Sequence, residues 1–142
     1  MSTSPADFNA QIIDEFRANE GRVGGRFEGL PLLLLHHTGA RSAKRYVNPL
    51  AYQPDNGRYV VFASKGGAPT NPAWYYNLTA NPDTEIEVGT QTIPVRAEEA
   101  RGEERDRLYR ALAERVPAFA DYERKTGGRI IPVIVLDPAR SS

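Results

Sequence analysis

Apolar residues near the N-terminus recur at helical spacing, with charged and polar residues between them. The apolar positions are Phe8, Ile12, Ile13 and Phe16. Ser4-Pro5, followed by Asp7, is typical of a helix start. The pattern predicts an N-terminal amphipathic helix over about residues 1–20, and we expect its apolar face to pack on the rest of the protein.

The hydrophobic pattern then changes to short runs that are typical of strands. Residues 31–37 form a continuous apolar run that ends in two histidines, the pattern of a buried strand. Residues 47–53 and 58–63 predict two more strands. Asp55-Asn56-Gly57 lies between them and predicts a hairpin turn, because glycine readily takes a positive φ.

The remaining pattern alternates between helices and strands. It predicts a helix over 73–80, strands over 84–88 and 91–96, helices over 101–116 and 118–124, and a strand over 129–136. Because most strands are joined by hairpins, the order favours an antiparallel sheet or small barrel over a doubly wound parallel sheet. The predicted fold class is mainly β with α (α+β).

Composition removes several classes of function. The chain has 142 residues, which suits one domain, and its 18 basic and 18 acidic side chains cancel, so no net field favours nucleic acid. There is no cysteine, and the two histidines are adjacent, so we expect no metal site. No signal peptide or membrane-spanning run is visible, and a cytoplasmic location is the expectation.

The loop after the first strand is basic. Arg41, Lys44 and Arg45 lie within five residues, and Ser42 adds a hydroxyl. Arginine offers a two-pronged donor and lysine a point charge, so such a loop can bind a phosphate or carboxylate. The alternative is a solvated turn that keeps a sheet edge soluble.

A second anion-binding candidate is Ser64-Lys65-Gly66-Gly67, between a strand and the helix that starts at Asn71-Pro72. Its glycines allow close approach of the backbone, and a helix N-terminus favours anions. The alternative is a simple strand-to-helix turn. A serine nucleophile activated by Lys65 has no supporting motif.

Aromatic residues form two further candidates. In Trp74-Tyr75-Tyr76-Asn77 we expect Trp74 to pack in the core with Leu78, and the others are candidates for ligand contact. Phe119 and Tyr122 can form an apolar wall, as core or as a lid over a planar ring. His36 and His37 are expected to be structural, because no defined carboxylate partner lies near them in the sequence.

Several segments together resemble the deazaflavin-dependent nitroreductase family of actinobacteria, whose members are F420H2-dependent quinone and nitro-compound reductases. The segments are Thr38-Gly39-Ala40-Arg41-Ser42, Val47-Asn48-Pro49-Leu50, Ala63-Ser64-Lys65-Gly66-Gly67, Asn71-Pro72-Ala73-Trp74-Tyr75-Tyr76-Asn77-Leu78 and Asn81-Pro82. The resemblance runs from about Arg22 to Pro138. It implies a single domain of residues 1–142, with the N-terminal helix over 1–20 and, over 22–138, a split β-barrel with peripheral helices, related to FMN-binding split barrels.

The resemblance also implies a binding site for coenzyme F420, a phosphorylated deazaflavin. Arg41 and Ser42 would contact its phosphate and polyglutamate tail. A basic residue usually precedes the Val-Asn-Pro motif in relatives; here Tyr46 fills that position, after Lys44 and Arg45. The other implied cofactor contacts are Asn48 and Pro49 at the ring, Phe62, Ala63, Ser64 and Lys65 at the ring edge and phosphate, and Ala73, Trp74, Tyr75, Tyr76 and Asn77 at the phosphate and ribityl chain.

The implied reaction is hydride transfer from the reduced deazaflavin to a small electrophile, a quinone first and a nitro compound second. Some relatives carry several tyrosines at the substrate wall. This chain has Val116 and Phe119 there and keeps only Tyr122, so it offers fewer hydroxyl donors to a substrate. Tyr122 is the candidate catalytic residue, as a donor to the developing oxyanion.

Two other functions stay open at the level of the sequence. An FMN-binding reductase on the same barrel would use the same basic residues, because both cofactors carry phosphate. A non-catalytic carrier of a tailed cofactor or lipid-like ligand could use the wall formed by Phe119 and Tyr122. A homodimer and a peripheral membrane contact through the amphipathic N-terminal helix are also left open.

Overall fold

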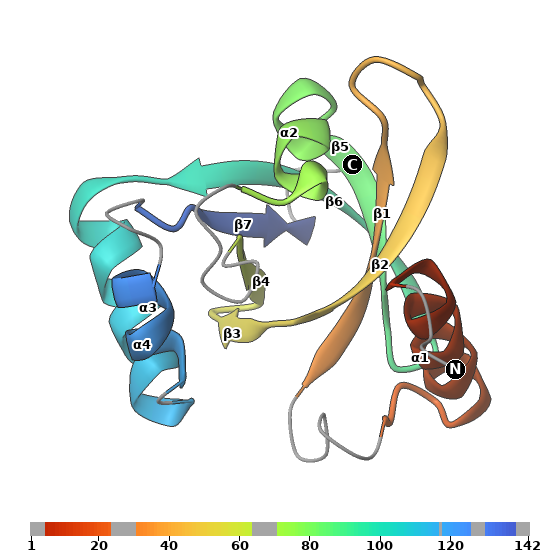
Figure 1. The fold of residues 1–142 in the computed structure, drawn as a ribbon, viewed down its shortest axis with the longest axis horizontal. Coiled ribbons are helices and arrows are strands. Elements are labelled where there is room, and N and C mark those ends of the chain that lie inside the picture. The colour runs from red at the N-terminus through yellow and green to blue at the C-terminus, as the bar shows by residue number, and fades with distance from the viewer. Residues whose placement is uncertain (1–4, 24–30, 64–70, 117, 126–129, 139–142) are drawn as a thin grey trace.

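The computed structural model describes residues 5–23, 31–63, 71–116, 118–125 and 130–138 (Figure 1). Its elements, in chain order, are α1 (Pro5–Ala18), β1 (Leu32–Thr38), β2 (Arg45–Ala51), β3 (Gln53–Asp55), β4 (Arg58–Phe62), α2 (Ala73–Ala80), β5 (Asp83–Val88), β6 (Gln91–Ala100), α3 (Gly102–Arg115), α4 (Ala118–Lys125) and β7 (Val133–Asp137).

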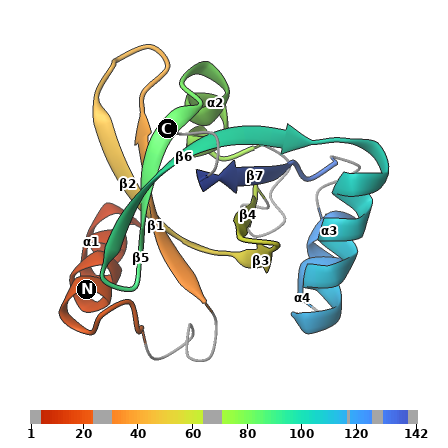
Figure 2. The ribbon, with the colours of Figure 1, turned by 180° about the vertical axis from the view of Figure 1, so that it is seen from behind.

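The strands form one curled seven-stranded sheet in the order β2-β1-β5-β6-β7-β4-β3, and all neighbouring strands are antiparallel. Helices α3 and α4 lie side by side at one end of the sheet, and α1 lies at the other, beside β1, β2 and β5 (Figures 1 and 2). Helix α2 lies against the upper part of the sheet in Figure 1. The predicted mixed α+β class with an antiparallel sheet is confirmed.

Strand β1 is buried on both faces, which explains its continuous apolar run. Leu33 and Leu35 point to one face and pack in a cluster with Trp74 and Leu78 of α2. On the other face, β1 packs against α1; the buried members of this cluster are Ile12, Phe16, Val23, Leu32 and Leu34. The predicted packing of Ile12 and Phe16 is therefore confirmed, and the Phe8 side chain lies outside the described part.

Two strand boundaries differ from the prediction. The expected strand over 47–53 is divided at Tyr52, because β2 pairs with β1 whereas β3 pairs with β4. Strand β6 continues beyond Arg96 to Ala100, because its second half pairs with β7 after its first half has paired with β5. Pairing partners of this kind are set by tertiary structure and leave little trace in a short sequence pattern.

The predicted hairpin turn between β3 and β4 is confirmed. Asn56 and Gly57 both have positive φ, 51° and 81°, as a two-residue type I′ connection requires. Asp55 starts this turn and forms an ion pair with Arg58 and another, at 3.2 Å, with Arg107 of α3. The turn is therefore also tied to the helical end of the molecule.

A third apolar cluster lies between the sheet and the pair of helices α3 and α4. Leu108, Tyr109 and Leu112 of α3 are its buried helical members. Arg105 also fixes α3, because its Nη2 donates a 2.8 Å hydrogen bond to the carbonyl of Ile131. None of the described helices is long and apolar enough to cross a membrane.

Candidate functional site

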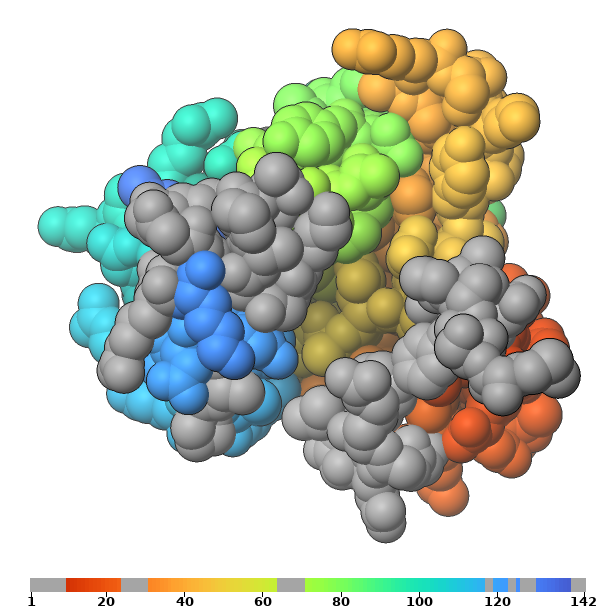
Figure 3. Space-filling model, in the orientation of Figure 1, coloured from red at the N-terminus to blue at the C-terminus, as the bar shows by residue number. Residues whose placement is uncertain are grey.

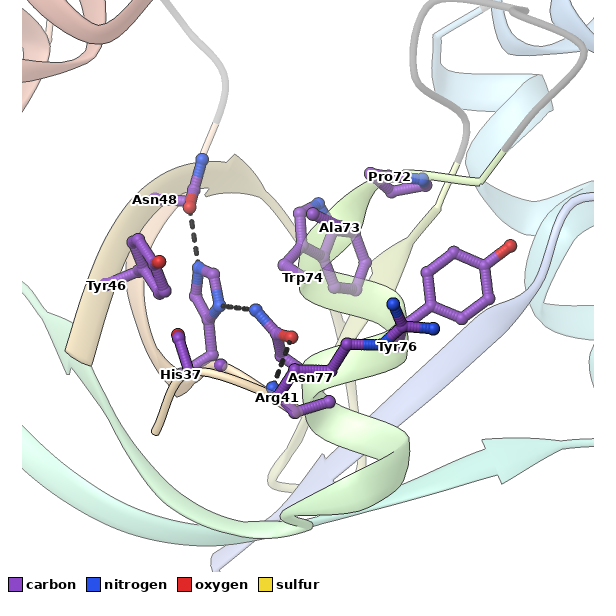
Figure 4. Close-up of a pocket in the computed structure, with 12 residues that line it drawn as sticks. His37, Arg41, Tyr46, Asn48, Pro72, Ala73, Trp74, Tyr76 and Asn77 are labelled. Carbon is purple, nitrogen blue, oxygen red and sulfur yellow. Dashed lines mark hydrogen bonds between the residues drawn. The ribbon is translucent and has the colours of Figure 1, made fainter. Parts of the chain in front are cut away.

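A cavity of about 920 Å³ opens between the β1–β2 hairpin and α2, which lie next to each other at the top of the molecule (Figures 1 and 3). Its lining is drawn in Figure 4 and consists of His37, Gly39, Ala40, Arg41, Ser42, Tyr46, Asn48, Pro72, Ala73, Trp74, Tyr76 and Asn77. The volume lies within the range typical of small-molecule sites, roughly 300–1,000 Å³.

The register of the hairpin brings the β-strand side chains of the cavity together. His37 pairs with Tyr46, and Leu35 pairs with Asn48. Directly paired residues of antiparallel strands point to the same face, so His37, Tyr46 and Asn48 lie on the side of the sheet that α2 covers. Pro49 pairs with Leu34 and lies on the opposite face, toward α1.

Hydrogen bonds connect the loop, the helix and both strands (Figure 4). The backbone N–H of Ala40 donates to Asn77 Oδ1 at 3.0 Å, and Asn77 Nδ2 lies 3.0 Å from His37 Nδ1. His37 Nε2 lies 2.6 Å from Asn48 Oδ1. We call this series the Asn77–His37–Asn48 relay. It holds α2 against the hairpin at the position where the cavity forms.

His37 is only 4% exposed, and the Tyr46 ring stacks on it with ring centroids 5.5 Å apart. Burial lowers the pKa of His37, with a smaller contribution from His36, whereas the bond to Asn48 acts in the opposite direction. The imidazole is therefore neutral near neutral pH, as the relay requires of a ring that both accepts and donates a hydrogen bond.

The loop between β1 and β2 presents Arg41 to the cavity, and its folded form follows from local contacts. Gly39 donates to the Lys44 carbonyl at 2.8 Å, and Ser42 Oγ accepts from the Lys44 N–H at 3.2 Å. A Cβ at Gly39 would lie 3.3 Å from a Tyr46 ring carbon and still closer to Ser42 Oγ, so a larger residue there requires the Ser42 hydroxyl to move. Among the lining residues that the structure describes, Arg41 carries the formal positive charge.

The structure brings together eight of the residues that the sequence predicted for the cofactor site. They are Arg41, Ser42, Tyr46, Asn48, Ala73, Trp74, Tyr76 and Asn77. Trp74 has both expected roles, because it is buried in the core with Leu78 and one part of it reaches the cavity. These residues come from separate segments, and the hairpin and α2 make them one surface.

Other predicted cofactor residues lie away from this lining. Lys44 is exposed, and Arg45 lies 3.6 Å from Glu85 in an ion pair. Phe62 and Ala63 are buried in separate clusters. Ser64 and Lys65 lie outside the described residues, and their predicted contacts with the cofactor stay predictions.

Tyr75 also points away from the cavity and packs against the core. Its hydroxyl donates to Glu99 at 2.7 Å, and burial together with this bond raises the pKa of Tyr75 to about 12. The hydroxyl is therefore held in place as a neutral donor, which is a structural role.

The predicted substrate wall lies in the cluster beneath α3 and α4. Phe119 contacts Phe62 and Tyr122, with ring centroids 6.2 Å and 5.0 Å away, and Val116 packs against the same cluster. These side chains do not belong to the lining of the 920 Å³ cavity. A substrate contact by Val116, Phe119 and Tyr122, and a catalytic role of Tyr122, stay predictions.

Sequence reasoning missed four residues of the lining, which are His37, Gly39, Ala40 and Pro72. His37 could have been found from the alternation of β1, because it shares a face with Leu33 and Leu35 and pairs across the hairpin with Tyr46. Ala40 contributes a backbone N–H, for which a sequence gives no direct signal.

The expectation that the histidines lack a carboxylate partner was wrong for His36. Its Nε2 lies 2.7 Å from Glu87 Oε2, and Arg17 of α1 forms a two-pronged pair with the same carboxylate. The partner comes from β5, which pairs with β1 although the two strands are distant in the sequence. The structural role expected for His36 is consistent with this network.

The cavity suits a planar, polar ligand that carries an anionic group. Arg41 provides positive charge, the Asn48 and Asn77 carboxamides provide polar groups, and Tyr46, Trp74 and Tyr76 provide aromatic surface. Among the described residues, no group of three or more His, Asp or Glu side chains is arranged to hold a metal ion. The charge, the carboxamides and the aromatic surface of the lining fit an organic cofactor with phosphate.

Comparison with known proteins agrees with this chemistry. The family model for the F420H(2)-dependent quinone reductase matches residues 10–138. The chain is 41% identical to an F420H(2)-dependent quinone reductase of Mycobacterium tuberculosis over 125 residues, which cover 85% of this chain and 83% of the relative.

Two solved structures are also similar. One is described as an F420-H2 dependent reductase (FDR-A), with a TM-score of 0.69, 40% identity and coverage of 75% of this chain and 94% of the other. The second is described as a domain-swapped dimer, with a TM-score of 0.71, 35% identity and coverage of 94% and 100%. These matches confirm the split-barrel fold class. The chain belongs to the F420H(2)-dependent quinone reductase family.

Proposed function

We propose that the protein is an oxidoreductase that binds reduced coenzyme F420 in the cavity between the β1–β2 hairpin and α2 and reduces a quinone. The observation that carries the proposal is the joint lining by Arg41, Asn48 and Trp74, in a chain of this family. The bound cofactor supplies the hydride, and the protein supplies orientation, charge and a partly dry pocket.

Each part of the cavity has a separate task in this proposal. Arg41 neutralises the phosphate of the cofactor through charged hydrogen bonds. Asn48 donates from its carboxamide to an acceptor atom of the ring. The aromatic side chains of Tyr46, Trp74 and Tyr76 exclude water around the planar part of the ligand. None of these side chains needs to form a covalent bond with the substrate.

FMN is the secondary candidate for the cofactor, because it also carries phosphate. Titration of the purified protein with F420 and with FMN distinguishes the two. We expect F420 to bind with a dissociation constant near micromolar or tighter and FMN to bind more weakly. Strong binding of FMN without binding of F420 would overturn the assignment.

Lys65 is part of the proposal on the strength of its sequence motif alone. If it contacts phosphate, Lys65→Ala costs about 1.5–3 kcal/mol of F420 binding free energy, the usual value of a charged hydrogen bond. The matched control is Lys125→Ala, a lysine of α4 that does not belong to the cavity lining. Equal affinities of the Lys65 and Lys125 variants would remove Lys65 from the site.

The proposal also covers the substrate, the oligomeric state and the location of the protein. A quinone is preferred to a nitro compound, because Val116 and Phe119 leave Tyr122 as the hydroxyl donor of the predicted substrate wall. A homodimer has support from the similarity to the domain-swapped dimer. A cytoplasmic location in an actinobacterium and peripheral membrane contact through α1 are further proposals.

A further inference from the structure

The direction of every hydrogen bond in the Asn77–His37–Asn48 relay can be deduced from one group. The backbone N–H of Ala40 is a donor and has no alternative role, so the atom of Asn77 that faces it must be Oδ1. The other end of the Asn77 carboxamide is then the NH₂ group, which must donate to His37 Nδ1.

The direction of the Asn77 hydrogen bond also determines which nitrogen of the His37 imidazole carries the proton. Because Nδ1 of His37 accepts a hydrogen bond, the proton of the neutral ring is on Nε2. Nε2–H then donates to Asn48, whose facing atom must be Oδ1, and the distance is 2.6 Å. The Asn48 NH₂ group consequently lies on the side away from His37, as Figure 4 shows.

We infer that His37 is a positioning residue that fixes the hydrogen-bonding polarity of the cavity at Asn48, so that the ligand meets an amide N–H donor and must supply an acceptor atom. A ring carbonyl or unprotonated ring nitrogen of a heteroaromatic cofactor is the chemical class that fits. The class of ligand rests on the proposed function, whereas the assignment of the His37 tautomer does not.

The surroundings of His37 support a fixed orientation. The imidazole is buried, its face is covered by Tyr46, and Asn48 and Asn77 both lie within hydrogen-bond distance. A reversal of the Asn48 amide would place its NH₂ group against Nε2–H, two donors facing each other in a buried site. The wrong orientation of Asn48 is therefore disfavoured before a ligand binds.

The tautomer can be measured on the protein without cofactor. The chain has two histidines, so ¹⁵N-labelled histidine gives two imidazole spin systems, and His36→Gln assigns them. We expect His37 to be the Nε2–H tautomer, with Nδ1 at a pyridine-like shift, at neutral pH. A His37 signal from the Nδ1–H tautomer would overturn the inference, whether or not F420 binds.

Two substitutions separate positioning from packing. His37→Phe keeps a ring beside Tyr46 but removes both hydrogen bonds, whereas His37→Gln keeps an N–H donor for Asn48. With affinity for F420 as the readout, we expect a loss of about tenfold for the Phe variant and rescue by the Gln variant to within about threefold of wild type. A tenfold loss corresponds to about 1.4 kcal/mol, which is within the range of a neutral hydrogen bond.

Thermal unfolding of both variants, followed by circular dichroism, identifies any loss of folded protein. If His37→Phe binds F420 as wild type does, or if both folded variants lose affinity equally, the positioning role is wrong. Absence of F420 binding by wild-type protein would instead refute the proposed function, and the tautomer measurement would still decide the role of His37.

Discussion

The Tyr46 ring stacks on the His37 imidazole, with an interplanar angle of 23° and ring centroids 5.5 Å apart. Tyr46 comes just before Val47-Asn48-Pro49 in the sequence, and it lines the cavity. Arg45, one position earlier, is not part of the lining and pairs with Glu85 instead. At this point the cavity wall is therefore formed by an aromatic side chain and not by the neighbouring positive charge.

This relationship predicts different effects for two neighbouring substitutions. Tyr46→Ala removes aromatic surface from the cavity and uncovers His37, so we expect F420 affinity to fall by about tenfold, the value of roughly 1–1.5 kcal/mol of lost aromatic contact. Arg45→Ala should change it less than threefold. Isothermal titration calorimetry gives both values, and a larger loss for Arg45→Ala would contradict the placement.

Substitution of Arg41 tests where the phosphate of F420 binds. Arg41→Ala should lower F420 affinity by about tenfold or more and should weaken the dependence of binding on salt, because a charged hydrogen bond is lost. Lys44→Ala is the matched control, since Lys44 is an exposed cation in the same loop and lies outside the cavity lining. Equal losses in the two variants would place the phosphate outside this cavity.

The Glu87 carboxylate connects α1 to the sheet, and its removal should destabilise the protein. The bond from Arg17, with a smaller effect of His36, lowers the pKa of Glu87 below its ordinary value of 4.5. The stabilisation is therefore complete above about pH 4.5 and is lost as the pH falls through the lower, folded-state pKa. Glu87→Gln should lower the free energy of unfolding by about 1 kcal/mol at neutral pH.

Urea denaturation at neutral pH and below pH 4 measures this effect. Glu85→Gln is the control, because Glu85 is 41% exposed and its contacts with His36 and Arg45 are 3.8 Å and 3.6 Å long. We expect a clearly smaller loss of stability for Glu85→Gln, and a smaller effect of Glu87→Gln in acid. A Glu87→Gln variant as stable as wild type at neutral pH would show that the pair contributes nothing.

The lowered pKa of His37 leads us to expect a second pH dependence of stability, in a different pH range. Because burial lowers its pKa below the ordinary value of 6.5, the unfolded chain takes up the proton first as the solution is acidified. The free energy of unfolding should then fall below pH 6.5, by at most about 1.4 kcal/mol per pH unit, and the fall should end below the folded-state pKa.

The difference in free energy of unfolding between wild type and His37→Gln isolates the contribution of His37, because His36 and all carboxylates are present in both proteins. Urea denaturation at a series of pH values between 7 and 5 supplies the data. A difference in stability that stays constant across this range would mean that His37 does not titrate as the structure indicates.

Much of the fold could be predicted from the sequence, because hydrophobic periodicity reports burial directly. The buried strand at Leu32–Thr38 and the turn at Asn56 and Gly57 are local features of this kind. The division at Tyr52 could not be predicted in the same way, since it depends on β2 and β3 having different partners in the sheet.

The site residues that belong to recognisable sequence motifs could be predicted from the sequence. Arg41, Asn48 and Asn77 belong to recognisable segments, and the structure brings them together. His37 was missed because its role depends on the register of the hairpin and on contact with α2. Pro49 was predicted to lie beside Asn48 at the deazaflavin ring. Because adjacent residues of a strand face opposite sides, Pro49 lies on the face toward α1 and outside the cavity lining.

Turnover tests most directly whether the protein uses F420H2 to reduce a quinone. Purified protein is mixed with reduced F420 and menadione under anaerobic conditions, and formation of oxidised F420 is followed by its absorbance. We expect a rate that is proportional to protein concentration and well above the uncatalysed rate, and a lower rate at subsaturating F420H2 for Arg41→Ala. Tight binding of F420 without turnover would contradict a quinone reductase activity and indicate a carrier of the cofactor.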